Sequence, residues 1–432
     1  MRLLRLNRAV IATALCAAAP ARAVVNVSIF GPGSQTLAIA VVPPERGGAA
    51  DPLGQEFARV LSRDLDLSGY FRVLDPSTFV EGPGIAPEAI DYVGWAAIGA
   101  QELVKGTIET SGDTLTLEAR MFDVVERRDV PEAGRRFQAP RSELPRLAHR
   151  YADHLLDVLT GERGPFDSKI ALVSTRGGRL KDVYLYTFDM AAPEKLTNER
   201  SITLSPGWRP DLRGILFTSY RDHQPRLFEL DLARRAAVQF SSEQRIYLGG
   251  AWSPDGTQVL ATREEDGNSD IELLDRWGGV VRRLTDHWDI DVSPAWAPDG
   301  RRFAFCSRRS GTPQIYAMGL DGSDVRRVSQ IGTYNTSPAW SPKGDRIAYA
   351  TRTGNVFQIV VANADGGRAR TITGAGSNED PSWAPDGRYL VFSSSRGGQR
   401  SLWITDRDGR SQKQLTTGMG DDSQPSWSSR LD

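Results

Sequence analysis

The stretch that decides the fold is residues 293–300, "SPAWAPDG", in which prolines flank a tryptophan and a Pro-Asp-Gly turn follows. The chain repeats this phrase as "GGAWSPDG" at 249–256 and as "SPAWSPKG" at 337–344. Six of the ten tryptophans stand in copies of this phrase, at Trp208, Trp252, Trp296, Trp340, Trp383 and Trp427, and their spacings are 44, 44, 44, 43 and 44 residues. A fixed period of this length indicates a repeat architecture.

Each repeat holds four short strand-like runs. After the tryptophan and its turn comes an alternating run such as "TQVLATR" (257–263), then an apolar run such as "QIYAMGLDG" (314–322), then a short segment such as "VRRVS" (325–329). Asp-Gly between such runs favours a hairpin, because glycine supplies the positive φ that the turn requires. Four strands in about 44 residues are typical of a β-propeller blade.

Counting the repeats gives six blades. Sets of three outer strands begin near Lys169, Arg213, Thr257, Arg301, Asp345 and Arg388. The first set has no tryptophan phrase before it, and the last phrase, at 424–429, has no set after it. We therefore expect the C-terminal strand to complete the first blade, closing a six-bladed β-propeller over residues 163–432.

Residues 36–162 lack the repeat and predict a small α/β domain. Strands are expected at 36–43, 71–75, 101–110, 114–126 and 135–139, and helices at 52–65, near 87–99 and at 142–161. In the last helix, apolar residues recur every three to four positions and Gly161 ends the pattern. The expected fold class is a two-domain chain, with this α/β domain followed by an all-β, circularly closed propeller.

The N-terminus predicts export. A basic "MRLLRLNR", an apolar "AVIATALCAAA" and "ARA" at 21–23 form a signal peptide over residues 1–23, cleaved near Ala23. Residues 24–35 would then form a flexible tail of the exported protein. Cys16 raises the alternative of a lipid anchor, but Leu15 before it is too bulky for that processing site. Cys306, the second of two cysteines, has no partner, so no disulfide is expected.

Charge argues against nucleic acid as a partner. The 432-residue chain has a net charge of −1, and the first 23 residues carry four arginines and no acid, so the mature chain has about −5. It contains no long basic run, which a phosphate backbone would require.

Catalytic motifs are absent from the sequence. It contains no G-x-S-x-G elbow, P-loop or dinucleotide fingerprint, so we expect no enzyme and no cofactor. His149 and His154 lie five residues apart, which predicts solvated helix residues, and His223 and His287 fall in turns of different blades. The repeated tryptophans could stack sugars or pack between blades, and their recurrence in every blade favours packing.

The loops before each phrase vary from copy to copy, and in a propeller they converge at one end of the central channel. We expect an acidic, aromatic-edged rim there that binds a partner. The candidate residues are Tyr247, Trp288, Asp289, Asp291, Ser293, Tyr334, Asn335, Thr336, Asn378, Glu379, Asp380, Asp421 and Asp422. Two alternatives stay open: ordinary solvated turns, and a Ca²⁺ ion in this funnel, although no ligand spacing defines such a metal site.

Several segments together resemble the TolB family, the periplasmic components of the Tol–Pal system of Gram-negative bacteria. They are the signal peptide, "LAIAVVP" (37–43), the junction "SELPRLAHRYADHLLDVLTGERGPFDSKIALVS" (142–174) and the W-x-P-D-G repeats ending in "PSWSSRLD" (425–432). The resemblance covers the whole mature chain. It departs at Ile246 and at Val292–Ser293, where a family member carries a histidine and a Thr-Glu pair.

The resemblance implies a monomeric, non-enzymatic adaptor that supports outer-membrane integrity and envelope constriction in cell division. The lipoprotein Pal would bind the channel face, and TolA would bind the tail "VVNVSIFGPG" (24–33) through Val25, Val27, Ile29 and Phe30. The chain would meet membranes only through partners, and other envelope proteins remain an open class of partner. The alternative functions are an exported propeller enzyme and a glycan-binding module.

Overall fold

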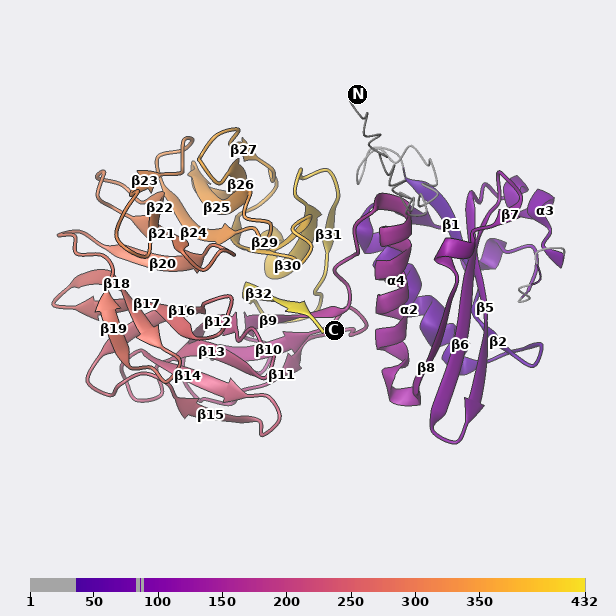
Figure 1. Ribbon diagram of the computed structural model, residues 1–432, viewed down its shortest axis with the longest axis horizontal. Helices are drawn as coiled ribbons and strands as arrows, with labels where there is room; N and C mark the ends of the chain where they lie inside the picture. The colour runs from indigo at the N-terminus through magenta and orange to yellow at the C-terminus, as the bar shows by residue number, and fades with distance from the viewer. Residues whose placement is uncertain (1–35, 83–85, 87–88, 432) are drawn as a thin grey trace, which may run out of the picture.

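The computed structural model describes residues 36–82, 86 and 89–431. A mixed α/β domain and a propeller lie side by side, and the C-terminal strand returns to the junction between them (Figure 1). Among the described residues, none of the helices is long and apolar enough to cross a membrane.

The α/β domain is one mixed sheet with helices. Its strands are β1 (Leu37–Val41), β2 (Glu45–Arg46), β3 (Ala49–Ala50), β4 (Phe71–Val73), β5 (Glu102–Ser111), β6 (Thr114–Asp123), β7 (Arg128–Asp129) and β8 (Arg135–Pro140). Its helices are α2 (Pro52–Ser68), α3 (Tyr92–Ala97) and α4 (Leu144–Thr160), with 3₁₀ turns η1 (Pro76–Thr78), η3 (Pro131–Ala133) and η4 (Arg141–Glu143). β1 pairs in parallel with β4 and β5, so α2 serves as the crossover that parallel strands require. β6 pairs antiparallel with β5 and β8.

The two long helices begin and end where the sequence provides caps. The Asp51 carboxylate accepts the Leu53 N–H at 2.8 Å and so satisfies a free donor at the start of α2. α2 and α4 each end at a glycine, Gly69 with φ 72° and Gly161 with φ 73°, a conformation that strains other residues. The apolar stripe predicted for α4 is buried, which confirms that helix.

The propeller consists of six four-stranded sheets, each with the tryptophan strand innermost. Blade 1 contains β32 (Asp422–Arg430), β9 (Ser168–Ser174), β10 (Asp182–Tyr186) and β11 (Glu194–Lys195). Blade 2 contains β12 (Thr203–Trp208), β13 (Gly214–Ser219), β14 (Arg226–Asp231) and β15 (Ala236–Gln239). Blade 3 contains β16 (Ile246–Trp252), β17 (Gln258–Glu265), β18 (Asn268–Asp275) and β19 (Val280–Arg283). Blade 4 contains β20 (Asp291–Trp296), β21 (Arg302–Ser307), β22 (Gln314–Gly319) and β23 (Arg326–Arg327). Blade 5 contains β24 (Asn335–Trp340), β25 (Arg346–Thr353), β26 (Val356–Asn363) and β27 (Arg370–Thr371). Blade 6 contains β28 (Asn378–Trp383), β29 (Tyr389–Gly397), β30 (Gln399–Asp406) and β31 (Gln412–Gln414).

Ring closure follows the prediction. β32 pairs antiparallel with β9, with Asp422 opposite Ser174 and Trp427 opposite Ile170. The last strand of the chain is therefore the innermost strand of the first blade. The predicted six-bladed, circularly closed propeller behind an α/β domain is confirmed.

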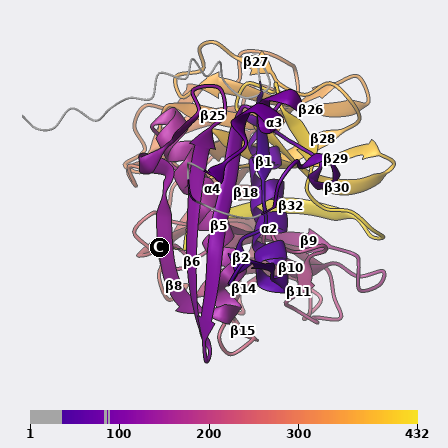
Figure 2. The same ribbon diagram turned by 90° about the vertical axis from the view of Figure 1, so that its right-hand side faces the viewer.

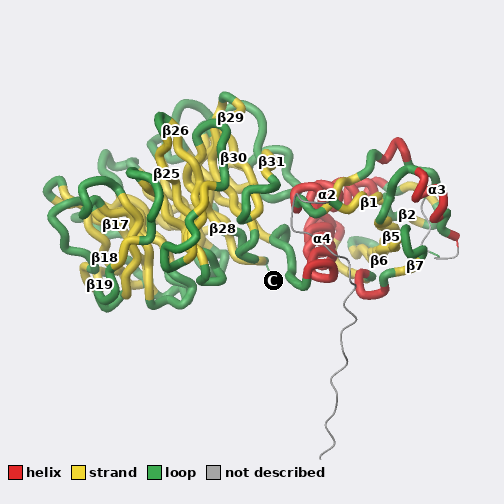
Figure 3. Tube along the Cα trace, turned by 90° about the horizontal axis from the view of Figure 1, so that it is seen from above, coloured by secondary structure: helices red, strands yellow, loops and turns green. Residues whose placement is uncertain are grey.

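The two domains share one hydrophobic core. Helices α2 and α4 lie between the sheet and the propeller (Figures 1 and 3). A single buried cluster runs from Ile39 and Tyr151 in the α/β domain to Tyr186 and Trp427 in the propeller. Across the junction, the Arg63 guanidinium donates to the Met190 carbonyl at 2.8 Å and to the Tyr186 hydroxyl at 2.7 Å. Burial of this size favours a fixed relation between the domains.

Candidate binding site at the propeller channel

Every tryptophan phrase contains a β-bulge three residues before its tryptophan. Pairing between the first two strands of each blade shifts register there, and the residue at the bulge has a positive φ. These residues are Ser205, Gly249, Ser293, Ser337, Asp380 and Gln424, with φ between 49° and 70°. A bulge redirects side chains at a strand end. Six such bulges therefore build one ring at the channel.

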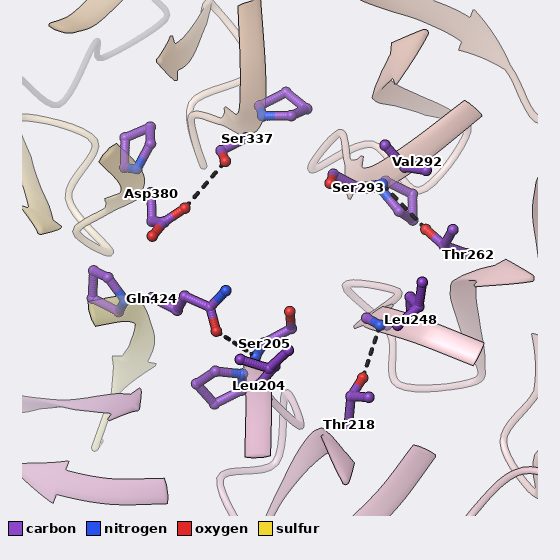
Figure 4. Close-up of a pocket in the computed structure, with 17 residues that line it drawn as sticks. Leu204, Ser205, Thr218, Leu248, Thr262, Val292, Ser293, Ser337, Asp380 and Gln424 are labelled. Atoms are coloured by element: carbon purple, nitrogen blue, oxygen red, sulfur yellow. Dashed lines mark hydrogen bonds between the residues drawn. The ribbon is translucent and has the colours of Figure 1, made fainter. Parts of the chain in front are cut away.

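The ring lines a cavity of about 460 Å³ at one end of the channel (Figure 4). A proline follows the bulge residue in five blades, and these prolines also line a second cavity of about 640 Å³, which the tryptophans border. The proline ring thus divides the channel into two chambers. Proline lacks a backbone N–H, and it is tolerated here because no further strand lies on the channel side of the innermost strand to accept a hydrogen bond.

Hydrogen bonds between blades hold the ring in place. The Ser205 N–H donates to Gln424 Oε1 at 2.9 Å, and the Ser337 hydroxyl donates to Asp380 Oδ1 at 3.1 Å (Figure 4). The Gly249 N–H donates to the Thr218 hydroxyl at 2.8 Å. The cavity wall is therefore preorganised.

Asp380 is the only carboxylate among the residues that line the 460 Å³ cavity. Burial raises the pKa of Asp380, and the neighbouring charge of Glu379 adds to the rise. Arg400 opposes this effect and forms an ion pair with Glu379 at 2.9 Å. The chamber therefore presents one carboxylate, which already accepts hydrogen bonds from the hydroxyls of Ser337 and Ser393.

The phrase tryptophans pack between blades. Their exposed fractions lie between 6% and 9%. The indole N–H groups of Trp208, Trp296 and Trp383 donate to carbonyls of the preceding blade's innermost strand at 2.9 to 3.0 Å. This arrangement agrees with the packing interpretation of the phrase tryptophans.

The rim prediction needs correction at five residues, which have exposed fractions of 0%. They are Tyr247, Asp291, Asn335, Asn378 and Asp422. All five stand five residues before a phrase tryptophan, where the innermost strand begins, as does the equally buried Thr203. These residues therefore belong to the repeat and not to the variable loops. Their constant distance of five residues from the phrase tryptophan is the signal that the sequence analysis missed.

Three of the buried five, Tyr247, Asp291 and Asp422, join strands within a blade, whereas Asn335 and Asn378 bond to the preceding blade. Asp422 binds the Arg176 guanidinium at 2.5 Å, and Asp291 binds Arg309 at 2.9 Å. The Tyr247 hydroxyl donates to Glu272 at 2.6 Å. Asn335 and Asn378 donate to the glutamine amides of Gln314 and Gln358. Such buried, paired groups belong to the interior of the fold and are not on a contact surface.

The other predicted residues remain accessible and form what we call the open rim. These are Trp288, Asp289, Ser293, Tyr334, Thr336, Glu379 and Asp421. Trp288 is 80% exposed, and Asp289 lies 3.7 Å from Arg308. The structure thus places an exposed tryptophan and several acids at the starts of the innermost strands and in the loops before them. The tail residues Val25, Val27, Ile29 and Phe30 lie outside the described residues.

His149 departs from the sequence-based expectation of a solvated residue. It is buried at the domain junction, with Nδ1 2.6 Å from Asp64 Oδ2 and Nε2 3.3 Å from Asp189 Oδ1. Although burial alone would lower it, the two carboxylates raise the pKa of His149 to about 10. The charged imidazole therefore links the α/β domain, through Asp64, to the propeller, through Asp189.

No group of three or more His, Cys, Asp or Glu side chains within the described part of the chain could hold a metal ion. The Ca²⁺ alternative therefore has no ligand set there. The expectation that no cofactor is needed stays a prediction.

Comparisons with known proteins match both domains. Residues 156–431 match the family model described as the TolB beta propeller domain, and residues 25–130 match the TolB amino-terminal domain. The crystal structure of TolB from Acinetobacter baumannii superposes with a TM-score of 0.79 at 26% identity, covering 93% of this chain and 98% of that one.

Curated relatives carry a consistent name. The Tol-Pal system protein TolB of Syntrophotalea carbinolica is 38% identical over 196 residues, 44% of this chain and 45% of the relative. That of Geobacter sulfurreducens is 40% identical over 185 residues, 42% of each chain. The chain spans less than half the length of these relatives. Both family models and the full-length structural match agree, and the chain belongs to the TolB family, whose relatives are components of the Tol–Pal system.

Proposed function

We propose that this chain is a periplasmic, non-enzymatic adaptor that binds Pal through the open rim and the chamber, and TolA through residues 24–33. The observation that carries the proposal is the preorganised ring of bulges, which lines a cavity with one carboxylate, Asp380, while the loop before one of the innermost strands exposes Trp288. Rigid aromatic and polar groups round a concave centre are typical of protein-binding sites.

An adaptor also needs communication between its two partners. We infer that order in residues 24–33 couples the two binding events. Coupling of this kind would appear as a change in Pal affinity when the tail is removed, because linkage between two sites is reciprocal.

The alternative of an exported propeller enzyme has less support. The residues that line the 460 Å³ cavity include no histidine and one acid, so they offer no acid–base pair.

Calorimetry with the soluble domain of the cognate Pal tests the proposal. We expect binding by the mature chain, weakened at least tenfold by Trp288→Ala, because a tryptophan that a partner buries commonly carries about 2 kcal/mol or more of the binding free energy. The matched control is Trp277→Ala, since Trp277 is 75% exposed on the turn after β18, away from the rim. Absence of binding heat, or equal weakening by both variants, would contradict the proposal. If a chain that lacks residues 24–33 binds Pal with unchanged affinity, the proposed coupling between the two sites is wrong, but the proposal of Pal binding stands.

A further inference from the structure

A basic groove lies in the α/β domain, outside the channel. It is a cavity of about 620 Å³ between the end of β8 and one flank of α4. Five arginines line it, with a single acid. The lining residues are Arg135, Arg136, Phe137, Arg146, Arg150, His154, Asp157 and Arg163. This concentration of positive charge stands out in a chain whose net charge is −1.

Two of the five arginines, Arg136 and Arg150, carry a charge that no carboxylate of the described residues neutralises. Arg146 and Arg163 bind Asp167, at 2.9 Å and 3.8 Å. By contrast, neither Arg136 nor Arg150 has a carboxylate within ion-pair distance anywhere in the described part of the chain, and both are exposed. The Arg150 guanidinium lies 5.6 Å from the centre of the Phe137 ring, which keeps it over the groove.

His154 adds no charge of its own. It receives a hydrogen bond at Nδ1 from Arg135, at 3.2 Å, and donates from Nε2 to the Glu132 carbonyl, at 2.8 Å. This pattern requires the neutral ring, and burial lowers the pKa of His154 accordingly. The histidine therefore fixes the position of Arg135.

β8 is an edge strand. It pairs with β6 and with no other strand among the described residues, and it lies outermost beside β6 and β5 (Figure 2). One backbone edge of its six residues is thus open beside the flank of α4. A groove between an edge strand and a helix is a geometry in which extended peptides add as an extra strand.

We propose that this groove binds an extended acidic peptide of a partner protein, which adds as a strand to β8 while its carboxylates bind Arg136 and Arg150. The guanidinium fork suits carboxylates in a bidentate pair, and Phe137 offers an apolar floor to alternate side chains. Arginines on an edge strand also discourage aggregation. That role does not require a helix beside the strand, nor a second unpaired arginine, Arg150, on that helix.

The test uses the full mature chain and a fluorescent, end-blocked peptide of alternating aspartate and valine. Anisotropy should show binding that weakens with salt, at least tenfold tighter than for the same peptide with asparagine in place of aspartate. Arg136→Glu with Arg150→Glu should weaken binding at least tenfold. The control pair Arg234→Glu with Arg301→Glu makes the same charge change on the propeller and should leave the affinity within twofold.

Hydrogen exchange separates strand addition from simple charge attraction. Bound peptide should slow exchange of amides in β8, and circular dichroism should show that all variants are folded. Four outcomes would overturn the proposal: equal affinity for the aspartate and asparagine peptides, equal weakening by both variant pairs, no protection of β8, or binding to inorganic phosphate or phosphatidylglycerol vesicles but not to the peptide.

Discussion

Replacing His149 with glutamine tests the charged contact that joins the two domains. In the wild-type chain His149 lies between Asp64 of α2 and Asp189 of the propeller, at 2.6 Å and 3.3 Å. Asp64 is fully buried, and its Oδ1 atom has no hydrogen-bond partner among the described residues. Without the imidazolium, Asp64 must take up a proton or remain an unpaired buried charge.

The expected loss of unfolding free energy is about 3 kcal/mol. A rise in the pKa of His149 from 6.5 to about 10 corresponds to about 5 kcal/mol of stabilisation. Burial raises the pKa of Asp64, so the cost of holding that carboxylate inside offsets part of this gain. Removing one partner of a buried ion pair typically costs about 3–5 kcal/mol, and the expected loss of about 3 kcal/mol lies at the lower end of this range.

The pH dependence has a defined sign. Because the folded pKa of His149 is raised, its stabilisation is fully present below pH 6.5 and is lost as pH rises through about 10. The stability difference between wild type and His149→Gln should therefore shrink as pH approaches 10.

Urea unfolding followed by circular dichroism measures the difference in unfolding free energy between the wild type and His149→Gln. Limited proteolysis at residues 161–166, in the connection between α4 and β9, reports separation of the domains. The control is His154→Gln on the same helix, which should cost less than about 1 kcal/mol because that ring makes only surface hydrogen bonds. Equal stability of the two variants at pH 7, or a difference that grows toward pH 10, would refute the reasoning.

Three further expectations concern the propeller. Trp383→Ala should lower the unfolding free energy by about 3–5 kcal/mol, whereas Trp288→Ala should change it by less than about 0.5 kcal/mol in the same urea titration. Asp380→Asn should raise the melting temperature at pH 7, because the raised pKa of Asp380 means that its stabilisation is lost as pH rises above 3.8; a gap that persists at pH 3 would contradict this. Cys306, whose thiol pKa burial raises to about 12, should react with an aromatic disulfide reagent only after unfolding, and rapid labelling of the native mature chain would show that the site opens.

The blade count could be predicted from the sequence because one large residue recurs at a fixed place in every blade. Trp208 to Trp427 pack in equivalent positions, so their spacing measures the blade length directly. The helices of the α/β domain could also be predicted, since the caps at Asp51, Gly69 and Gly161 lie in the chain itself. These features depend on local sequence and on one repeated contact.

Residues at the channel could be predicted only in part. The loops were expected to be exposed because their residue types vary, yet Tyr247, Asn378 and Asp422 serve one structural purpose with different chemistry. Each pairs with a different partner, Tyr247 and Asp422 in their own blades and Asn378 in the preceding blade, so identity varies while burial does not. His149 was misjudged for another reason: the flank of α4 that carries it is covered by the propeller, which helix periodicity does not report.

The ring of bulges connects the fold to the proposed function. A left-handed backbone costs a residue other than glycine about 1 kcal/mol, and five of the six ring residues are not glycine. Interblade bonds at Gln424 and at the Ser337–Asp380 pair offset part of that cost. Ser293 is different, because its hydroxyl has no hydrogen bond within the described residues and its side chain is exposed. Its backbone N–H donates to the Thr262 hydroxyl of the preceding blade at 3.1 Å, so the left-handed backbone at Ser293 belongs to the shared ring of bulges and leaves its hydroxyl exposed. The same bulge that shapes the chamber thus brings Ser293 to the open rim, where a partner would contact it.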